Sequence, residues 1–564
     1  MRITVHQIDC NNRINRKIMN KLLSRTTGFI FKQQTSILSS TLMLAGMMLL
    51  SRIAGFLRYR ILGGYFNPHE LDIFYAAFRI PDLVFEILIN GALSTTFIPF
   101  FIEYQKRKKE QNNIISSIIN TVTIGLFFFI VILTIFMPVL IPLIAPGFDA
   151  TQIKLLILYS RILLLGQLPF LVLGNFLTAI SQAKKSFLIP ALAPILYNVA
   201  IIVCIALFSE SFHLMAPVVG VVVGAFVFFM IQLPVFYIAG FQFKLVLDHF
   251  KESIRFFRTA LPRILTIIVA QIDATVDLSL ATLLGPGSYT VFYLAQRLQL
   301  LPVSVIGMSF GQASLPYLSE MYQEKRYREY RDVIISSILN IFYFTIPTAG
   351  FMIITRTPLV RLFFGADKFD WNATVMTALT LSYFALSLPL HSIYYFLTRC
   401  FYSTFDTRTP FYVSAVSIAL SATLSIIFTL VLKMPVWSLA LSFSITMSIR
   451  SVVLIFLLNK KVDGLNILAL TKGSIKIGIA VLNTTILTYF LMRLLDGLIL
   501  DTSRTVNVFT LLVIGFAFFS IMYLFLSWLF GIQEMYILTR MFMKMNEYKK
   551  KIFEVYKGVE YGNE

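Results

Sequence analysis

The stretch that decides the fold is ILSSTLMLAGMMLLSRIAGFLRYR, residues 37–60. Its first part, up to Leu50, is apolar or small, which suits a helix inside a hydrocarbon core roughly 30 Å thick. Its second part carries Arg52, Arg58 and Arg60. A charge at the bilayer centre costs on the order of 2.5 to 3.5 kcal/mol on insertion scales, so such side chains must face protein or water. The stretch therefore predicts a membrane helix beside a polar cavity.

The rest of the chain has the same apolar character. Of its 564 residues 57% are hydrophobic and only 13% are charged, and the mean hydropathy of +0.79 excludes an ordinary soluble domain. Apolar segments of about 20 residues recur from Ile37 to Phe530, each long enough to cross a bilayer. We count fourteen such segments, which predicts an all-α polytopic membrane protein with fourteen transmembrane helices.

The Lys and Arg residues behind the net charge of +20 lie mainly in alternate loops. Basic stretches such as KRKK (106–109) and EKRYREYR (324–331) alternate with short, mostly uncharged loops such as APGFDA (145–150) and GPGS (285–288). The positive-inside rule then places both termini in the cytoplasm, with Arg356–Asp370 as the one discordant stretch. This distribution indicates a membrane protein and excludes nucleic acid as the partner of the positive charge.

The chain also repeats itself. FYAAFR (74–79) recurs as FYLAQR (292–297), and FLTAISQAKKSFLIP (176–190) recurs as FLTRCFYSTFDTRTP (396–410) at nearly the same offset. Two pseudo-symmetric halves of six spans each, in the same membrane orientation, follow from this repeat. The predicted organisation is a basic cytoplasmic N-terminal segment (1–35), an N-terminal six-helix lobe (36–240), a C-terminal six-helix lobe (241–459), an appended helix pair (460–531) and a basic cytoplasmic tail (532–564).

Several arginines fall inside the predicted spans. Arg79 and Arg297 occupy equivalent positions in the two repeats, so a pseudo-two-fold axis would place them across a central cleft. With Arg52 and Arg58 they would form a cationic chamber suited to a diphosphate, because guanidinium groups bind phosphate oxygens in pairs. For any single arginine, a buried ion pair or a side chain that reaches the interface is the competing interpretation.

Four longer motifs connect the chain to a known family: SRIAGFLRYRIL (51–62), LDIFYAAFRIPDL (71–83), NGALSTTFIPFFIEY (90–104) and AQRLQLLPVSVIGMSFGQASLPYLSE (295–320). They resemble the MurJ (MviN) lipid II flippases of the MOP exporter superfamily, and the similarity covers nearly the whole chain. The resemblance implies two six-helix lobes around a cationic cavity, with the two extra helices forming a groove for a lipid tail. It implies a transporter, not an enzyme, that moves undecaprenyl-diphosphate-linked peptidoglycan precursor from the inner to the outer leaflet of the bacterial cytoplasmic membrane.

Family positions can be matched one by one. The two first-helix arginines match Arg52 and Arg58, the second-helix acidic residue matches Asp72, and the eighth-helix arginine matches Arg297. The chain departs from the family pattern at four positions: Tyr59, Phe85, Glu86 and Asn90. The predicted substrate-binding residues are Arg52, Arg58, Asp72, Arg79, Asn90 and Arg297.

Some family members couple transport to an ion or to the membrane potential. The resemblance implies a cation site among the seventh, eleventh and twelfth helices. Asp273 and Asp277 lie one turn apart on the seventh and Asp406 begins the eleventh, so these three carboxylates are the candidate ligands of a sodium ion. Structural ion pairs would explain the same residues. We expect no other cofactor.

Other functions remain open from sequence. A relative that moves another polyprenyl-diphosphate glycan, or a transport-inactive scaffold for proteins of cell-wall synthesis or division, fits the same features. A multidrug exporter would need an anionic cavity. A membrane glycosyltransferase would need a catalytic domain that the short outer loops leave no room for, and the chain has no Gly-rich phosphate loop.

Overall fold

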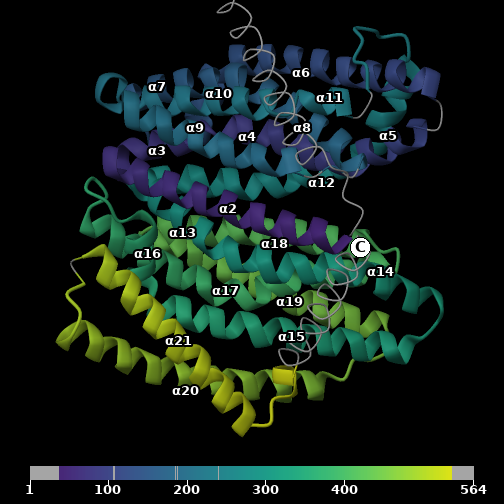
Figure 1. Ribbon diagram of the computed structural model, residues 1–564. Helices are drawn as coiled ribbons and strands as arrows, with labels where there is room; N and C mark the ends of the chain where they lie inside the picture. Colours follow the sequence, from purple (N-terminus) through teal and green to yellow (C-terminus); the bar gives the residue numbers. More distant parts are fainter. Residues whose placement is uncertain are drawn as a thin grey trace, which may run out of the picture. The chain divides into compact units, whose positions relative to one another are not determined.

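The computed structural model describes residues 37–536 apart from 106–107, 185, 187, 239–240 and 503. The described residues form helices and connecting turns, and they contain no β-strand. The chain divides into two compact units (Figure 1). Unit 1 comprises Met1–Gly287 and Ala366–Phe369, and unit 2 comprises Ser288–Gly365 and Asp370–Glu564.

Unit 1 begins with one long helix and then a segmented one. Its elements are α2 (Ile37–Tyr65), α3 (Pro68–Ala77), α4 (Arg79–Glu86), the π-helix η1 (Ile87–Phe97), α5 (Ile98–Gln105), α6 (Lys108–Ile144), α7 (Ala150–Ile162), the π-helix η2 (Leu163–Gln167), α8 (Leu168–Ala183), α9 (Leu188–Phe212), α10 (Met215–Met230), α11 (Pro234–Ile238) and α12 (Phe250–Leu283). The detached segment Ala366–Phe369 joins unit 1 through the Lys368 N–H, which donates to the Gly63 carbonyl at 3.1 Å.

Unit 2 contains the remaining helices. They are α13 (Ser288–Pro302), the π-helix η3 (Val303–Met308), α14 (Ser309–Gln323), α15 (Tyr327–Ile354), α16 (Arg356–Phe364), α17 (Trp371–Ser403), α18 (Arg408–Ile426), the π-helix η4 (Ile427–Val431), α19 (Trp437–Lys461), α20 (Ile467–Leu498), α21 (Thr505–Leu529) and the 3₁₀ turn η5 (Gln533–Met535). Helices α20 and α21, the appended pair, pack on each other, and α20 also packs on α15 (Figure 1).

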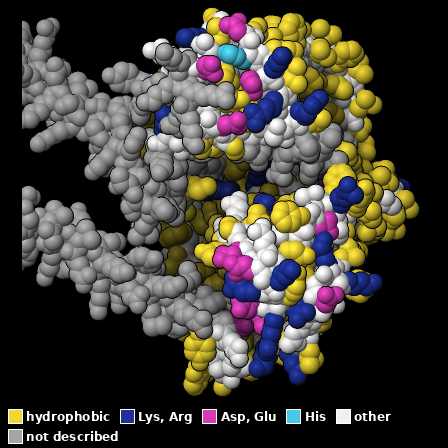
Figure 2. All heavy atoms as spheres, turned by 90° about the vertical axis from the view of Figure 1, so that its right-hand side faces the viewer, with side chains coloured by type: hydrophobic (Ala, Val, Ile, Leu, Met, Phe, Trp, Pro, Cys, Tyr) yellow, Lys and Arg dark blue, Asp and Glu magenta, His cyan; other side chains and the backbone are white. Residues whose placement is uncertain are grey.

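The outward faces of the long helices are apolar. On α6, Phe127, Ile135 and Leu143 are 61%, 66% and 71% exposed. Large apolar side chains with this exposure belong in lipid, not in water. Seen from one end of the molecule, charged side chains gather on the face toward the viewer, with hydrophobic surface flanking them (Figure 2). The protein is therefore a multi-pass membrane protein.

Eleven helices among the described residues are long and apolar enough to cross a membrane. The long helical segments outside that set are α2, the α3–α5 series and α12, and each of them carries charged side chains. These three would complete the fourteen spans that the sequence predicts. That number stays a prediction.

The second helix of each repeat is interrupted in a similar way. In the first half η1 separates α4 from α5, and in the second half η3 separates α13 from α14. Single π-helical turns inside α-helices are rare and are frequent at functional sites. In η3 and α14, Gly307 and Gly311 also permit close packing, because an added Cβ would lie 2.6 Å from Ser392 Cα and 2.9 Å from the Tyr395 carbonyl oxygen on α17.

The division between the units differs from the lobe boundary expected from the repeat. The sequence predicts a boundary near residue 240, whereas unit 1 extends to Gly287 and includes α12. The reason is packing, since α12 lies against η1, α6 and α4. Compactness and internal repetition therefore give different divisions of this chain.

Candidate functional site

Arg52 and Arg58 both lie on α2 in unit 1, but in different surroundings. Arg52 is exposed, whereas Arg58 is half-buried. The Arg58 guanidinium carbon lies 4.9 Å from the centroid of the Tyr59 ring. Arg58 also donates a hydrogen bond to the Tyr197 hydroxyl on α9, close to the charge of Asp82. Tyr59, one of the departures from the family pattern, thus covers one face of the guanidinium.

Arg79 is held by α12 of the same unit. Its Nη2 donates to the Gln271 carbonyl oxygen at 2.6 Å and to the Gln271 side-chain oxygen at 2.8 Å. Its Nε donates to Thr275 Oγ1 at 3.0 Å. Gln271 and Thr275 are four residues apart, so they lie on one face of α12. Together they accept the hydrogen bonds of the Arg79 guanidinium. These contacts give Arg79 a positioning role inside unit 1.

Arg297 lies on α13 in unit 2 and has an aromatic partner, as Arg58 does. Its guanidinium carbon is 4.6 Å from the Tyr293 ring centroid, and its Nη2 donates to the Tyr293 hydroxyl at 2.9 Å. Tyr293 precedes Arg297 by one helical turn, which places the two side chains on one face. Because Arg79 and Arg297 belong to different units, their predicted pairing across a cleft stays a prediction.

Asp72 is buried and accepts a hydrogen bond from the backbone of a distant turn. It is 1% exposed, and its Oδ2 accepts the Gly287 N–H at 2.6 Å. Gly287 has a φ of +81° in the turn after α12, a conformation that favours glycine. This charge-assisted hydrogen bond ties α3 to that turn. The predicted contact of Asp72 with substrate gains no support from so buried a position.

Three of the four departures from the family pattern, Phe85, Glu86 and Asn90, lie on α4 and η1. Phe85 and Glu86 are half-buried at the end of α4. Asn90 falls in η1, but its side chain lies outside the described residues. Its role in substrate binding stays a prediction.

The three carboxylates predicted to bind a cation lie in both units, Asp273 and Asp277 in unit 1 and Asp406 in unit 2. Asp277 is 5% exposed and interacts with the charges of Asp273 and Arg79. Within the described chain, no group of three or more His, Cys, Asp or Glu side chains is placed to hold a metal ion. The sodium site stays a prediction.

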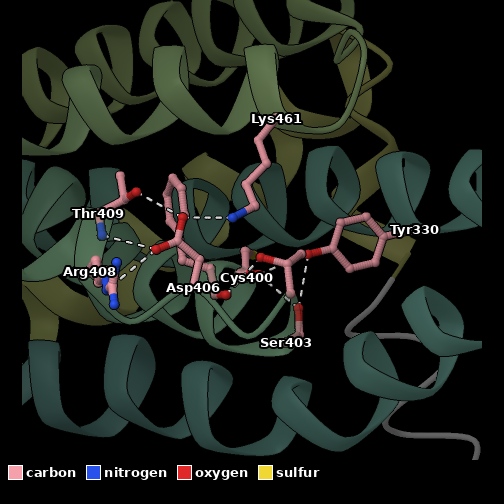
Figure 3. Close-up of polar contacts among 9 residues, drawn as sticks. Tyr330, Cys400, Ser403, Asp406, Arg408, Thr409 and Lys461 are labelled. Carbon is pink, nitrogen blue, oxygen red and sulfur yellow. Dashed lines mark hydrogen bonds and ion pairs between the residues drawn. The ribbon is translucent and has the colours of Figure 1, made fainter.

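Asp406, the third of these carboxylates, belongs to a cluster of polar contacts at the ends of α17, α18 and α19 (Figure 3). Its carboxylate accepts from Lys461 Nζ at 2.6 Å, from the Thr409 hydroxyl at 2.8 Å and from the Thr409 N–H at 3.0 Å. Partial burial would raise the pKa of Asp406, but the hydrogen bonds from Lys461 and Thr409 and the Lys461 charge lower this pKa to about 2. Asp406 is therefore an anchor for Lys461.

An apolar cavity of about 330 Å³ lies between α15 and α21 in unit 2. Its lining is mainly aromatic: Tyr343, Phe344, Phe351, Phe516, Phe519 and Tyr523. The sequence predicts a tail groove formed by the appended helix pair. This cavity involves one member of that pair, α21, together with α15.

Sequence reasoning named the charged residues but missed their partners. Gln271, Thr275, Tyr197 and Gly287 all lie far along the chain from the residues they hold. The one local signal was the pair of polar residues at positions 271 and 275, four apart on a segment that also carries Asp273 and Asp277. A single sequence does not indicate which charge that pair receives.

Comparisons with known proteins agree with the motifs. The family described as lipid II flippase MurJ matches residues 67–500. A lipid II flippase MurJ of Burkholderia cenocepacia is 27% identical over 65% of this chain and 74% of its own length. A Bdellovibrio bacteriovorus relative, named a probable lipid II flippase MurJ, is 27% identical over 81% of this chain and 89% of its own length.

Solved structures share the fold. A lipid II flippase MurJ in an inward closed conformation matches with a TM-score of 0.71 and 24% identity, covering 86% of this chain and 99% of that one. An inward-facing multidrug resistance MATE family transporter of the MOP superfamily matches with a TM-score of 0.63 and 15% identity, covering 77% and 99%. The resemblance that the motifs predicted is confirmed, and because the family match spans most of the sequence, this chain belongs to the lipid II flippase MurJ family.

Proposed function

We propose that this chain is a flippase that carries lipid II from the inner to the outer leaflet of the bacterial cytoplasmic membrane by alternating access. The observation that carries the proposal is the family match over residues 67–500. The eleven apolar helices and the fold shared with MOP superfamily transporters support it. Nothing in this chemistry breaks or forms a covalent bond, so the protein acts as a transporter and not as an enzyme.

The headgroup of lipid II carries a diphosphate, and arginine is the side chain best suited to bind it. We assign this binding to Arg52, Arg58 and Arg297. The Tyr59 and Tyr293 rings each cover a guanidinium face at 4.9 Å and 4.6 Å. A guanidinium donates its hydrogen bonds in its own plane, so an aromatic ring on one face fixes its orientation while it binds phosphate oxygens at its edge.

The prenyl tail needs only an apolar surface. The aromatic cavity between α15 and α21 offers one, with a volume of about 330 Å³ that admits part of an isoprenoid chain. In this proposal the tail stays in the cavity or in the bilayer while the headgroup crosses. The headgroup alone then needs a polar route.

Coupling to the membrane potential is the form of coupling that we propose, and coupling to sodium stays a prediction. Asp277 interacts with the charges of Asp273 and Arg79, and Asp406 accepts a hydrogen bond from Lys461. An anionic headgroup that leaves a negative cytoplasm gains about 2.3 kcal/mol per charge per 100 mV. The potential therefore supplies a driving force without any bound ion.

Both termini are proposed to lie in the cytoplasm. The alternating basic loops support this orientation through the positive-inside rule. Proteins that synthesise the cell wall or divide the cell are the partners we propose, because the lipid that is carried is made at the inner leaflet and used at the outer one.

The test is transport of labelled lipid II by the purified chain in liposomes. We expect the label to reach the opposite leaflet faster than in empty liposomes, and faster than a second polyprenyl-diphosphate glycan with an unrelated headgroup. Equal transport of both lipids would replace lipid II with a broader substrate class. A rate no higher than that of empty liposomes would leave a scaffold as the better account.

A further inference from the structure

Unit 2 contains a buried arginine that the transport proposal does not use. Arg450 lies near the middle of α19 and is 9% exposed, so it does not reach toward lipid or water. Its helix packs on α17 and α18. Its guanidinium carbon lies 5.3 Å from the centroid of the Tyr394 ring on α17.

The helices around Arg450 provide no counter-charge. All residues of α13, α17, α18 and α19 are described, and none of them is Asp or Glu. The structure records neither a hydrogen bond nor an ion pair for the Arg450 side chain among the described residues, and its Nε is buried without an acceptor. A ring face attracts a cation much less than desolvation disfavours it, so Tyr394 alone does not balance this charge.

Neutral polar groups line the same region. Arg450 interacts electrostatically with His391 and Tyr395 of α17. The Tyr395 ring stacks on the His391 imidazole at 5.5 Å, and His391 Nδ1 lies 3.1 Å from Gln299 Nε2 on α13. Gln299 Oε1 is buried without a partner, so the Gln299 amide is only half satisfied. We call these residues the Arg450 cluster.

We propose that the Arg450 cluster binds one small monovalent anion, such as chloride, inside unit 2. An anion supplies the negative charge that the surrounding helices lack and accepts the hydrogen bond that Arg450 Nε does not make among the described residues. Because Arg450 is only 9% exposed, we expect a single small ion there and not a diphosphate headgroup. The site is separate from the substrate arginines and does not depend on which lipid the chain carries.

The test uses the full chain, purified in detergent and exchanged into gluconate, an anion too large for the cluster. We expect chloride and bromide to raise the melting temperature saturably by several degrees, because a ligand that binds only the folded state stabilises it. Arg450→Gln should abolish this rise. Arg399→Gln is the matched control, since Arg399 also lies over a tyrosine ring, Tyr402, at 5.6 Å but is only half-buried, and it should keep the rise.

Direct binding covers the case in which Arg450→Gln does not fold. Wild-type protein should bind radioactive chloride at one ion per chain, and excess bromide should displace it. Two results would overturn the proposal: wild-type protein that binds no chloride, or an Arg450→Gln variant whose melting temperature rises with chloride as much as that of the wild type.

Discussion

Asp72 acts through the backbone of a distant turn. Its buried carboxylate accepts the Gly287 N–H at 2.6 Å, and a Cβ at position 287 would lie 3.1 Å from Pro68 Cβ. The carboxylate and the glycine therefore fix how the start of α3 meets the end of α12. Loss of either group disturbs the second helix of the first repeat, on which Arg79 also lies.

Replacing Asp72 with alanine should therefore lower stability. A buried N–H left without an acceptor costs about 1 to 3 kcal/mol, so thermal unfolding in detergent should show a clear fall in melting temperature. Asp72→Asn keeps an acceptor oxygen and should cost less. If both variants unfold at the wild-type temperature, the tie between α3 and the Gly287 turn is unimportant.

Arg79 attracts the buried Asp277 as well as binding α12. Arg79→Ala should remove three hydrogen bonds and the favourable Coulomb interaction with Asp277, and a buried polar group left without its partner costs about 1 to 3 kcal/mol. The double variant Arg79→Ala/Asp277→Asn should recover part of this loss. Chemical unfolding of the three proteins measures it, and a double variant no more stable than Arg79→Ala would refute the coupling.

At the scale of elements, the second helix of each repeat contains a π-helical interruption, and in the second repeat this region also packs closely on another helix. The π-helical stretches η1 and η3 interrupt corresponding segments of the two halves. The glycines of the second of these segments have a packing function, since they bring it against α17. A π-helical stretch and a tight helix contact thus occur together in the segment that follows Arg297.

Gly307→Ala should therefore be destabilising. The added methyl would lie 2.6 Å from Ser392 Cα and 2.8 Å from its carbonyl oxygen, so η3 must shift away from α17. We expect a loss of about 1 to 3 kcal/mol in thermal unfolding. Gly478→Ala on α20 is the control, because nothing lies within 4 Å of its added Cβ and alanine favours the helix. Equal effects of the two changes would contradict the packing argument.

The ion pair between Asp406 and Lys461 predicts how the stability of the protein depends on pH. The pKa of Asp406 is lowered to about 2 from its ordinary value of 3.8, so its stabilising effect is complete above 3.8 and is lost as the pH falls through 2. Between pH 5 and pH 8 the difference in melting temperature between wild type and Asp406→Asn should be constant. A difference that changes across this range would show that Asp406 titrates at a higher pKa.

At the scale of the whole molecule, the sequence predicted features that follow from local pattern. The helical membrane class and the two-fold repeat follow from composition, the length of the apolar segments and the recurring motifs. The family follows from the motifs around Arg58, Asp72 and Arg297. These signals are read from neighbouring residues, so one sequence suffices.

Features that depend on distant contacts were not predictable. The residues of α12 that bind Arg79 are more than 190 positions away in the sequence, and no local pattern indicates this contact. Likewise the hydrogen bond from Lys461, at the end of α19, to Asp406 joins residues 55 positions apart. Tertiary packing determines which partner each charged residue contacts. A single sequence does not indicate these long-range contacts.

The most direct test of the central claim is transport of labelled lipid II by liposomes that contain Arg58→Ala/Arg297→Ala protein. Both are replaced because a single substitution would leave two of the three arginines that we assign to the diphosphate, Arg52, Arg58 and Arg297, in place. We expect at least a tenfold loss of rate, since each charge-assisted contact contributes about 1.5 to 3 kcal/mol. Folding is checked by a melting temperature close to that of the wild type. Transport by this double variant at the wild-type rate would contradict the account.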